Sequence, residues 1–126
     1  MRLLLDSNAV LWYAVDSPRL ADGAHAAIAD NEHERFVSSA TVWELGIKQA
    51  AGRLNLPADL VGRIADAGFR ELPITFKHAA HAAQLPRHHN DPFDRMLVAQ
   101  AQFEGLTIVT SDAEISRYQV AVLPAA

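Results

Sequence analysis

Short apolar runs alternate along this chain with longer segments in which apolar residues recur at helical spacing. Leu3, Leu4 and Leu5 form a continuous apolar run that stops at Asp6, as expected of a strand buried on both faces. Further strands are predicted at residues 36–38, 69–72, 106–110 and 120–123. Helices are predicted at residues 8–15, 20–31, 39–51, 58–67, 76–84 and 92–104, with a helical turn or two at 113–118.

The helix predicted at residues 92–104 has the clearest boundaries. Asp91 is a preferred N-cap residue, and Pro92 suits the first helical position because its fixed φ is already helical. Gly105 follows the last apolar position and is a typical stop signal. Side chains in the first turn of this helix are therefore placed by local sequence alone.

Strands that alternate with helices are typical of a mostly parallel sheet with helices on both faces. The predicted order is β-α-α-β-α-α-β-α-α-β-α-β. We therefore expect the α/β class, as a single-domain three-layer α/β/α sandwich with a mostly parallel central sheet. In such folds, ligands bind at the carboxyl ends of the strands, where the N-termini of the helices also point.

Composition limits the chemistry that this fold can carry. The 126 residues fit one domain, so residues 1–126 are treated as a single unit. Half of them are apolar, which excludes wholesale disorder. Cysteine is absent, which excludes disulfides, thiolate catalysis and zinc–thiolate sites. The formal net charge of −4 argues against nucleic-acid binding through bulk positive charge alone.

The compartment follows from the lack of targeting signals. No apolar run approaches the roughly 20 residues that a membrane-spanning helix needs. The apolar run at residues 3–5 is also too short for a signal peptide. We therefore expect a cytoplasmic protein with no membrane partner.

Four acidic residues are predicted at one edge of the sheet. Asp6 ends the first strand, and Asp112 lies just beyond the strand at 106–110. Glu44 lies near the start of the helix at 39–51, and Asp94 lies in the first turn of the helix at 92–104. Because the carboxyl ends of parallel strands share one edge, all four are expected there.

Carboxylates that converge without matching Lys or Arg repel one another, so such a cluster needs raised pKa values or a cation. Hard divalent cations prefer oxygen ligands, and Mg²⁺ commonly takes carboxylates, waters and a substrate phosphate. In a chain without Cys, Mg²⁺ or Mn²⁺ is favoured over zinc. A cation of this kind suits phosphodiester hydrolysis, because it activates water and neutralises charge on phosphate.

Each acidic residue also has a simpler interpretation. Asp6 can cap the following helix. Thr41 and Glu44 fit a capping box, and Glu44 can pair with Lys48 one turn later. Asp91 can serve as a helix cap, and Asp94 suits the first turn of a helix. Asp112 can be a plain turn residue. The metal-site hypothesis therefore depends on joint placement at one edge.

Other polar and aromatic residues give weaker signals. Arg87 and Arg95 lie near the acidic edge and are candidates for phosphate contacts or for surface ion pairs. His88 and His89 adjoin the Asp91 turn. We favour a position in a surface loop for both, and a role at the acidic edge is the second interpretation. Surface positions are expected for the other histidines named here, His25, His33, His78 and His81. Core or interface positions are expected for Trp12, Trp43, Leu45 and Met96.

Two other protein classes place acids at strand ends of a parallel sheet. A receiver-like signalling module binds Mg²⁺ but needs a Lys on a late strand, and residues 106–110 and 120–123 contain none. A phosphatase of the aspartyl-phosphate type needs a second Asp two residues after the first, where this chain has Asn8. Both classes remain weaker alternatives to a metal-dependent phosphodiesterase.

The pattern resembles the PIN-domain ribonucleases, and within them the VapC-type toxins of bacterial type II toxin–antitoxin systems. The resemblance covers nearly the whole chain in the expected order. Its most specific part is Asp-Pro-Phe-Asp-Arg followed by Ala-Gln-Ala. The matching blocks are LLLDSN (3–8), SATVWELGIK (39–48), GRL (52–54), HHNDPFDRMLVAQA (88–101) and VTSD (109–112).

The resemblance implies an acidic pocket that binds Mg²⁺ or Mn²⁺ and cleaves single-stranded RNA. Residues that match the family's acidic quartet are Asp6, Glu44, Asp94 and Asp112. We expect Asp6, Asp94 and Asp112 to ligate the metal, with Glu44 as a further ligand or as the group that orients the attacking water. Secondary candidates are Ser7, where the family often has Thr, the accompanying acid Asp91, and Arg95. Asn8 departs from close relatives, which often carry His there.

The resemblance further implies a growth-inhibiting toxin that blocks translation, a homodimer, and a cognate VapB-type antitoxin whose C-terminal segment blocks the pocket. A catalytically silent PIN fold that acts through a partner remains open, as does a deoxyribonuclease using the same site. The choice between RNA and DNA depends on contacts to the 2′-hydroxyl.

Overall fold

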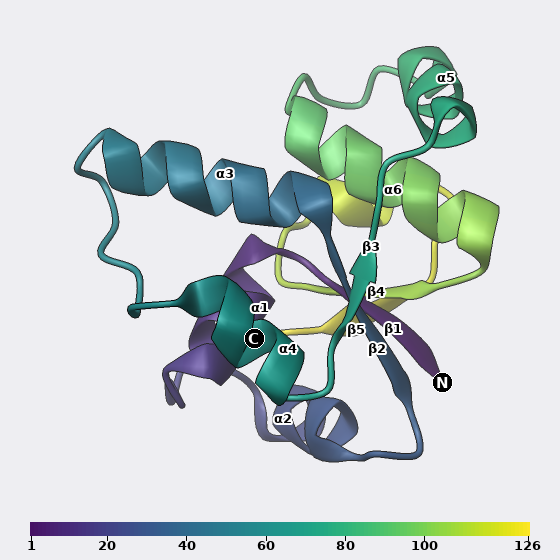
Figure 1. The fold of residues 1–126 in the computed structure, drawn as a ribbon. Helices are drawn as coiled ribbons and strands as arrows, with labels where there is room; N and C mark the ends of the chain where they lie inside the picture. The colour runs from purple at the N-terminus through teal and green to yellow at the C-terminus, as the bar shows by residue number, and fades with distance from the viewer.

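The computed structural model describes residues 1–126 and contains one five-stranded sheet with helices packed on both sides (Figure 1). The strands are β1 (Arg2–Leu5), β2 (Glu34–Ser38), β3 (Arg70–Leu72), β4 (Thr107–Thr110) and β5 (Val122–Pro124). The helices are α1 (Ser7–Ala14), α2 (Asp22–Ala29), α3 (Ser39–Ala50), α4 (Leu60–Asp66), α5 (Phe76–Gln84), α6 (Pro92–Glu104) and the 3₁₀ helix η1 (Ile115–Arg117). The predicted α/β/α sandwich is confirmed.

The strand order is β3-β2-β1-β4-β5, and every neighbouring pair is parallel. From the central β1, the chain continues to β2 on one side and returns later to β4 on the other. The carboxyl ends of β1 and β4 therefore border the point where the strand order reverses. Crevices at such switch points are the usual binding places in open parallel sheets.

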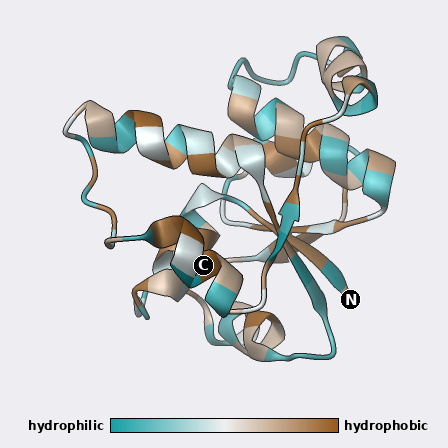
Figure 2. Cartoon of the chain, in the orientation of Figure 1, coloured by the Kyte–Doolittle hydropathy of each residue, from teal (hydrophilic) through white to brown (hydrophobic).

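Alternation along β1 divides the core into two layers. Leu3 and Leu5 face a cluster that includes residues of α1 and α2, whereas Leu4 faces a cluster that includes residues of α6. All three leucines are fully buried, so β1 is covered on both sides. Figure 2 shows apolar residues concentrated where the strands cross at the centre of the molecule. This packing fixes β1 and, with it, the residue that follows.

Two local predictions were wrong. Ser38, and not Thr41, caps α3: its side chain accepts a hydrogen bond from the Ala40 amide at 3.1 Å. Thr41 lies inside α3 with a buried hydroxyl that has no partner, so it forms no capping box with Glu44. His78 was expected at the surface but is only 2% exposed. Its ring accepts a hydrogen bond from the Thr75 amide and contacts the carboxylate of Glu104 at 3.2 Å.

The C-terminal elements are shorter than predicted. Residues 113–118 contain only the three-residue η1, and the last strand begins at Val122 and not at residue 120. The Val120 amide instead donates to the Tyr118 carbonyl at 2.9 Å, which keeps residues 118–120 in a tight turn. None of the helices combines the length and apolar character needed to cross a membrane.

Candidate active site

The four predicted acids come from four different elements at the carboxyl edge of the sheet. Asp6 follows β1 directly and caps α1, and Asp112 lies two residues beyond β4. Glu44 projects from the second turn of α3. Asp94 lies in the first turn of α6, which starts at Pro92 as predicted. The parallel topology and the packing of α3 against α6 bring these elements together (Figure 1).

Asp6 is held firmly and is 7% exposed. One of its carboxylate oxygens accepts the Ala9 amide at 2.9 Å, and the other accepts the Thr110 hydroxyl at 2.6 Å. Burial raises the pKa of Asp6, and repulsion from Glu44 and Asp112 adds to the rise, although the two hydrogen bonds oppose it. Asp6 is therefore a rigid acid in an electrostatically unfavourable place.

Asp94 has the most strongly perturbed carboxyl group of the chain. Burial is the largest cause, and it acts with repulsion from Asp91, Asp112 and Glu44 to raise the pKa of Asp94 to about 8. The proximity of the Asp112 side chain acts in the same direction. The site therefore disfavours an ionised Asp94 in the absence of a cation.

Positive charge in the cluster is sparse. Lys48 pairs with Glu44 at 3.2 Å, one turn along α3 as the spacing predicted. The expectation of acids without matching Lys or Arg was therefore wrong for Glu44. Asp6, Asp94 and Asp112 form no ion pair with Lys or Arg, and the only basic side chain on Asp94 is His89. The cluster keeps an excess of negative charge that a divalent cation would neutralise.

The acids suit a hard cation in kind, but they do not form a ready-made chelate. No three of the chain's His, Asp or Glu side chains are close enough to hold a metal ion as they stand. The donor set nevertheless consists of carboxylate oxygens, which Mg²⁺ and Mn²⁺ prefer, and their mutual repulsion contributes to the raised pKa of Asp6 and of Asp94.

The secondary candidates have distinct structural roles. Asp91 caps α6 by accepting the Phe93 and Asp94 amides at 2.9 and 3.1 Å, as its local sequence predicted. Ser7 is the first residue of α1, beside Asp6. Arg95 does not face the edge as a free phosphate ligand. Its guanidinium donates to the carbonyls of Ala82, Leu85 and Pro86 and to the Tyr118 hydroxyl, so it ties α6 to the end of α5.

Sequence reasoning missed one group that contacts the acids and gave the wrong order of preference for a second. Thr110, the last residue of β4, is 2% exposed and holds Asp6 through its hydroxyl. The sequence feature that could have indicated Thr110 is a polar residue at the end of an apolar strand. His89, placed first in a surface loop, has a side chain only 14% exposed and contacts Asp94 at 3.3 Å. Its position five residues before Asp94 was the available hint.

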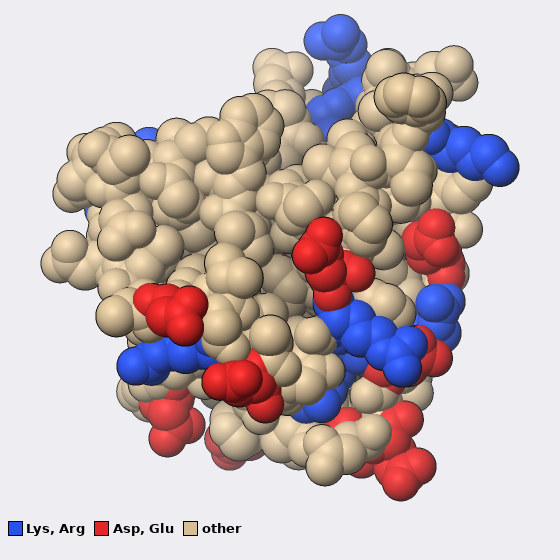
Figure 3. Space-filling view, viewed as in Figure 1, with Lys and Arg blue, Asp and Glu red and all other residues tan.

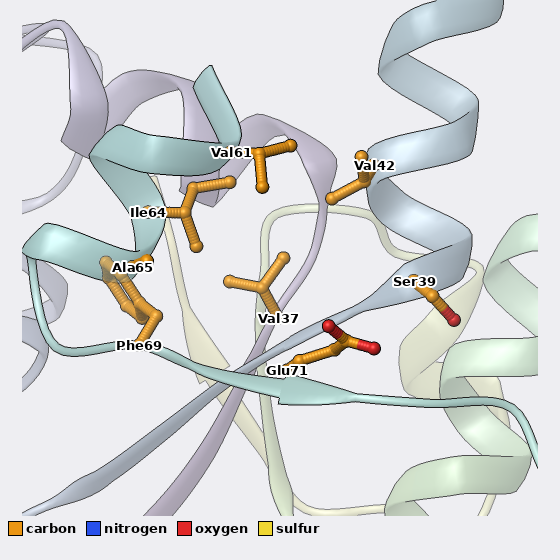
Figure 4. A pocket seen from close by; sticks show the side chains of 8 residues that line it. All are labelled: Val37, Ser39, Val42, Val61, Ile64, Ala65, Phe69 and Glu71. Atoms are coloured by element: carbon orange, nitrogen blue, oxygen red, sulfur yellow. The ribbon is translucent and has the colours of Figure 1, made fainter. Parts of the chain in front are cut away.

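A mostly apolar hollow of the surface is lined by none of the four acids. A cavity of about 240 Å³ opens between α3, α4 and β2 (Figure 4). Its lining residues are Val37, Ser39, Val42, Val61, Ile64, Ala65, Phe69 and Glu71. The surrounding surface over α3 is almost uncharged on the face shown in Figure 3. This hollow contains none of the four acids and has no chemistry of its own.

Comparison with known families identifies the fold. The PIN domain family matches residues 3–121. The chain belongs to the PIN domain family. Ribonuclease VapC22 of Mycobacterium tuberculosis is 28% identical to this PIN domain over 120 residues, covering 93% of this chain and 92% of the relative.

Solved structures share the architecture of this PIN domain. DNA-bound VapBC from Salmonella typhimurium superposes with a TM-score of 0.74 at 18% identity, covering 100% of this chain and 99% of that chain. VapBC2 from Rickettsia felis, bound to a promoter DNA fragment, superposes with a TM-score of 0.72 at 14% identity, covering 98% of both chains. At these identities the likeness establishes the fold of the PIN domain.

Because the pKa of Asp94 is raised, we expect the stability of the metal-free protein, measured in EDTA, to depend on pH. Because its folded-state pKa of about 8 exceeds the ordinary 3.8, the folded protein binds more protons than the unfolded chain between these values. Its free energy of unfolding should therefore fall as pH rises through this interval, by on the order of 2 kcal/mol from Asp94. The measurement is urea unfolding of the wild type and of Asp94→Asn at pH 5 to 9. A constant difference between the two proteins would contradict the shift.

Proposed function

We propose that this protein is a Mg²⁺- or Mn²⁺-dependent endoribonuclease that hydrolyses RNA phosphodiester bonds. The observation that carries the proposal is the convergence of Asp6, Glu44, Asp94 and Asp112 at the switch point of the sheet, where repulsion among them helps to raise the pKa of Asp94 to about 8. Membership of the PIN family and the similarity to a VapC ribonuclease support the choice of RNA as substrate.

In this proposal Asp6, Asp94 and Asp112 hold the cation, and Glu44 is a further ligand or orients the attacking water. When bound, the cation activates water and stabilises charge on the phosphate. Thr110 and the Ala9 amide keep Asp6 fixed, so that one ligand needs no rearrangement. The Asp91 side chain holds the first turn of α6, which keeps Asp94 at the edge.

The biological role follows as part of the same proposal. The similarity to a VapC ribonuclease and to solved VapBC complexes supports a toxin of a type II toxin–antitoxin system that inhibits translation and growth in the cytoplasm. Its partners are then RNA, a VapB-type antitoxin and a second copy of the chain. The largely uncharged face over α3 and the apolar hollow beside α4 offer area for protein contacts (Figures 3 and 4).

Two observations favour a second candidate, a catalytically silent PIN fold that acts by binding a partner. The acids do not form a ready-made chelate, and Glu44 is already paired with Lys48. A receiver-like module is not favoured, because β4 and β5 carry no Lys. The nuclease and the silent fold differ in one measurable property, metal-dependent hydrolysis.

The test uses single-stranded RNA and DNA oligonucleotides of the same base sequence, incubated with Mg²⁺, with Mn²⁺ or with EDTA. Asp112→Asn is the site variant, and Asp66→Asn is the matched control, because Asp66 is an exposed residue that ends α4. We expect cleavage of RNA by wild type and Asp66→Asn only, and only with the metal. Equal cleavage of DNA would indicate a deoxyribonuclease, and no cleavage by a folded, partner-free wild type would support the silent fold.

A further inference from the structure

A histidine reaches the candidate active site from the loop between α5 and α6. The Nε2 atom of His89 lies 3.3 Å from one carboxylate oxygen of Asp94, and both side chains are 14% exposed. His89 is the only basic side chain that contacts Asp94. His89 therefore contacts the carboxylate of Asp94, which also experiences repulsion from three other acids.

The other ring nitrogen of His89 is anchored to the protein interior. Its Nδ1 atom lies 2.9 Å from the hydroxyl of Tyr118, which is 5% exposed. Arg95 donates to the same hydroxyl at 3.2 Å. Arg95 is itself fixed by three backbone carbonyls of residues 82, 85 and 86. The ring is thus held between a rigid framework and Asp94.

One assignment of donors and acceptors satisfies every hydrogen bond in this chain. A guanidinium only donates, so the Tyr118 oxygen accepts from Arg95 and keeps its own proton to donate. A neutral His89 that accepts this proton at Nδ1 carries its hydrogen on Nε2. The Nε2–H group then donates to the Asp94 carboxylate. Every member of the chain has a donor matched to an acceptor.

We propose that His89, held by Tyr118 and Arg95, is a positioning residue that orients the Asp94 carboxylate toward the bound cation. The inference rests on the proposed function, because it assigns Asp94 as a metal ligand. Groups that hydrogen-bond to metal ligands fix ligand orientation, and their loss typically weakens metal affinity by 10- to 100-fold. The role differs from packing, because it requires a donor at the Nε2 position.

The neighbouring His88 provides an internal control. Its ring packs edge-to-face with the ring of Tyr118, with ring centroids 4.8 Å apart, but it forms no hydrogen bond or ion pair with an acid. A substitution of His88 therefore disturbs the same aromatic neighbour without removing a contact to Asp94. His88→Gln should leave metal binding unchanged.

The experiment measures Mn²⁺ affinity by electron paramagnetic resonance on the partner-free protein, together with the melting temperature in EDTA. Gln places its amide nitrogen where His89 has Nε2, whereas Asn places it where His89 has Nδ1. We expect His89→Gln to stay within about 3-fold of the wild-type Kd, and His89→Asn and His89→Ala to weaken Mn²⁺ binding by about 10-fold or more. Tyr118→Phe, which removes the donor to Nδ1, should weaken binding by a smaller factor.

The outcomes separate this inference from the proposed function. If the wild type binds Mn²⁺ and His89→Ala binds it with the same affinity, the positioning role is overturned and the proposed function is not. Equal weakening by Gln, Asn and Ala, in step with a lower melting temperature in EDTA, also overturns it, because packing then explains the loss. A folded wild type that binds no Mn²⁺ contradicts the proposed function, and the inference with it. Rescue by Gln with an unchanged melting temperature supports the positioning role.

Discussion

Asp94→Asn is expected to abolish RNA cleavage and at the same time to stabilise the metal-free protein. The substitution removes a proposed metal ligand, and a loss of roughly 4 kcal/mol of transition-state stabilisation corresponds to about a 1,000-fold lower rate. It also removes a buried carboxyl group that faces three other acids. At pH 8 in EDTA, we expect a gain on the order of 1–2 kcal/mol in the free energy of unfolding.

The two readouts for Asp94→Asn are the initial rate of RNA cleavage and urea unfolding of the same preparation. Asp66→Asn makes the same carboxylate-to-amide change at an exposed position, and it should match the wild type in both. Opposite effects on rate and stability are typical of a strained functional group and not of general damage. Full activity of Asp94→Asn would remove Asp94 from the mechanism. A destabilised and inactive variant would instead indicate a structural role.

Mn²⁺ is expected to raise the melting temperature of the wild type by about 10 °C at pH 8. A ligand at 100 times its Kd stabilises the folded state by about 2.7 kcal/mol, and in a domain of this size each kcal/mol shifts the melting temperature by a few degrees. The shift should shrink at pH 6, because Asp94, with its pKa of about 8, must lose its proton before it can bind the cation.

The control for Mn²⁺ is a variant that removes one proposed ligand. Asp6→Asn and Asp94→Asn should lose most of the shift, and Asp66→Asn should keep it. The measurement is a thermal scan with and without Mn²⁺ on protein treated with EDTA and freed of any co-purified chain. A wild type that shows no shift at saturating Mn²⁺, or a shift that survives both substitutions, would contradict a metal site at this edge.

Much of the fold could be predicted because its signals are local. The apolar run of β1, the cap at Asp91 and the proline after it depend on neighbouring residues only, and α6 begins where they indicated. Alternating strands and helices then led to a parallel sheet. The four acids could be assigned to one edge because parallel topology alone determines which ends of the strands meet.

Three of the wrong or incomplete predictions involve choices that local sequence leaves open. Ser38 and Thr41 are both good capping residues. Because β2 ends at Ser38 and α3 begins at the next residue, Ser38 is the cap. The burial of His78 depends on Glu104, which is 26 residues away. The contact between His89 and Tyr118 spans 29 residues. No spacing rule links such pairs, because only the packing of helices and loops brings them together.

Arg95 shows the same limit at the level of function. An arginine one residue after a proposed metal ligand is a natural candidate for a phosphate contact. In the structure, its donors are used by the carbonyls at the end of α5 and by Tyr118. The residue contributes to the site through the framework that holds His89 and not through charge presented to a substrate.

The most direct test of the account is the cleavage of total cellular RNA by purified, partner-free protein in Mg²⁺, in Mn²⁺ and in EDTA, beside Asp94→Asn. The account predicts discrete RNA products that require the metal and disappear in the variant. Mapping the ends of these fragments would identify the target RNA. Intact RNA in every lane, with a folded wild-type protein, would contradict a ribonuclease and favour a PIN fold that acts through a partner.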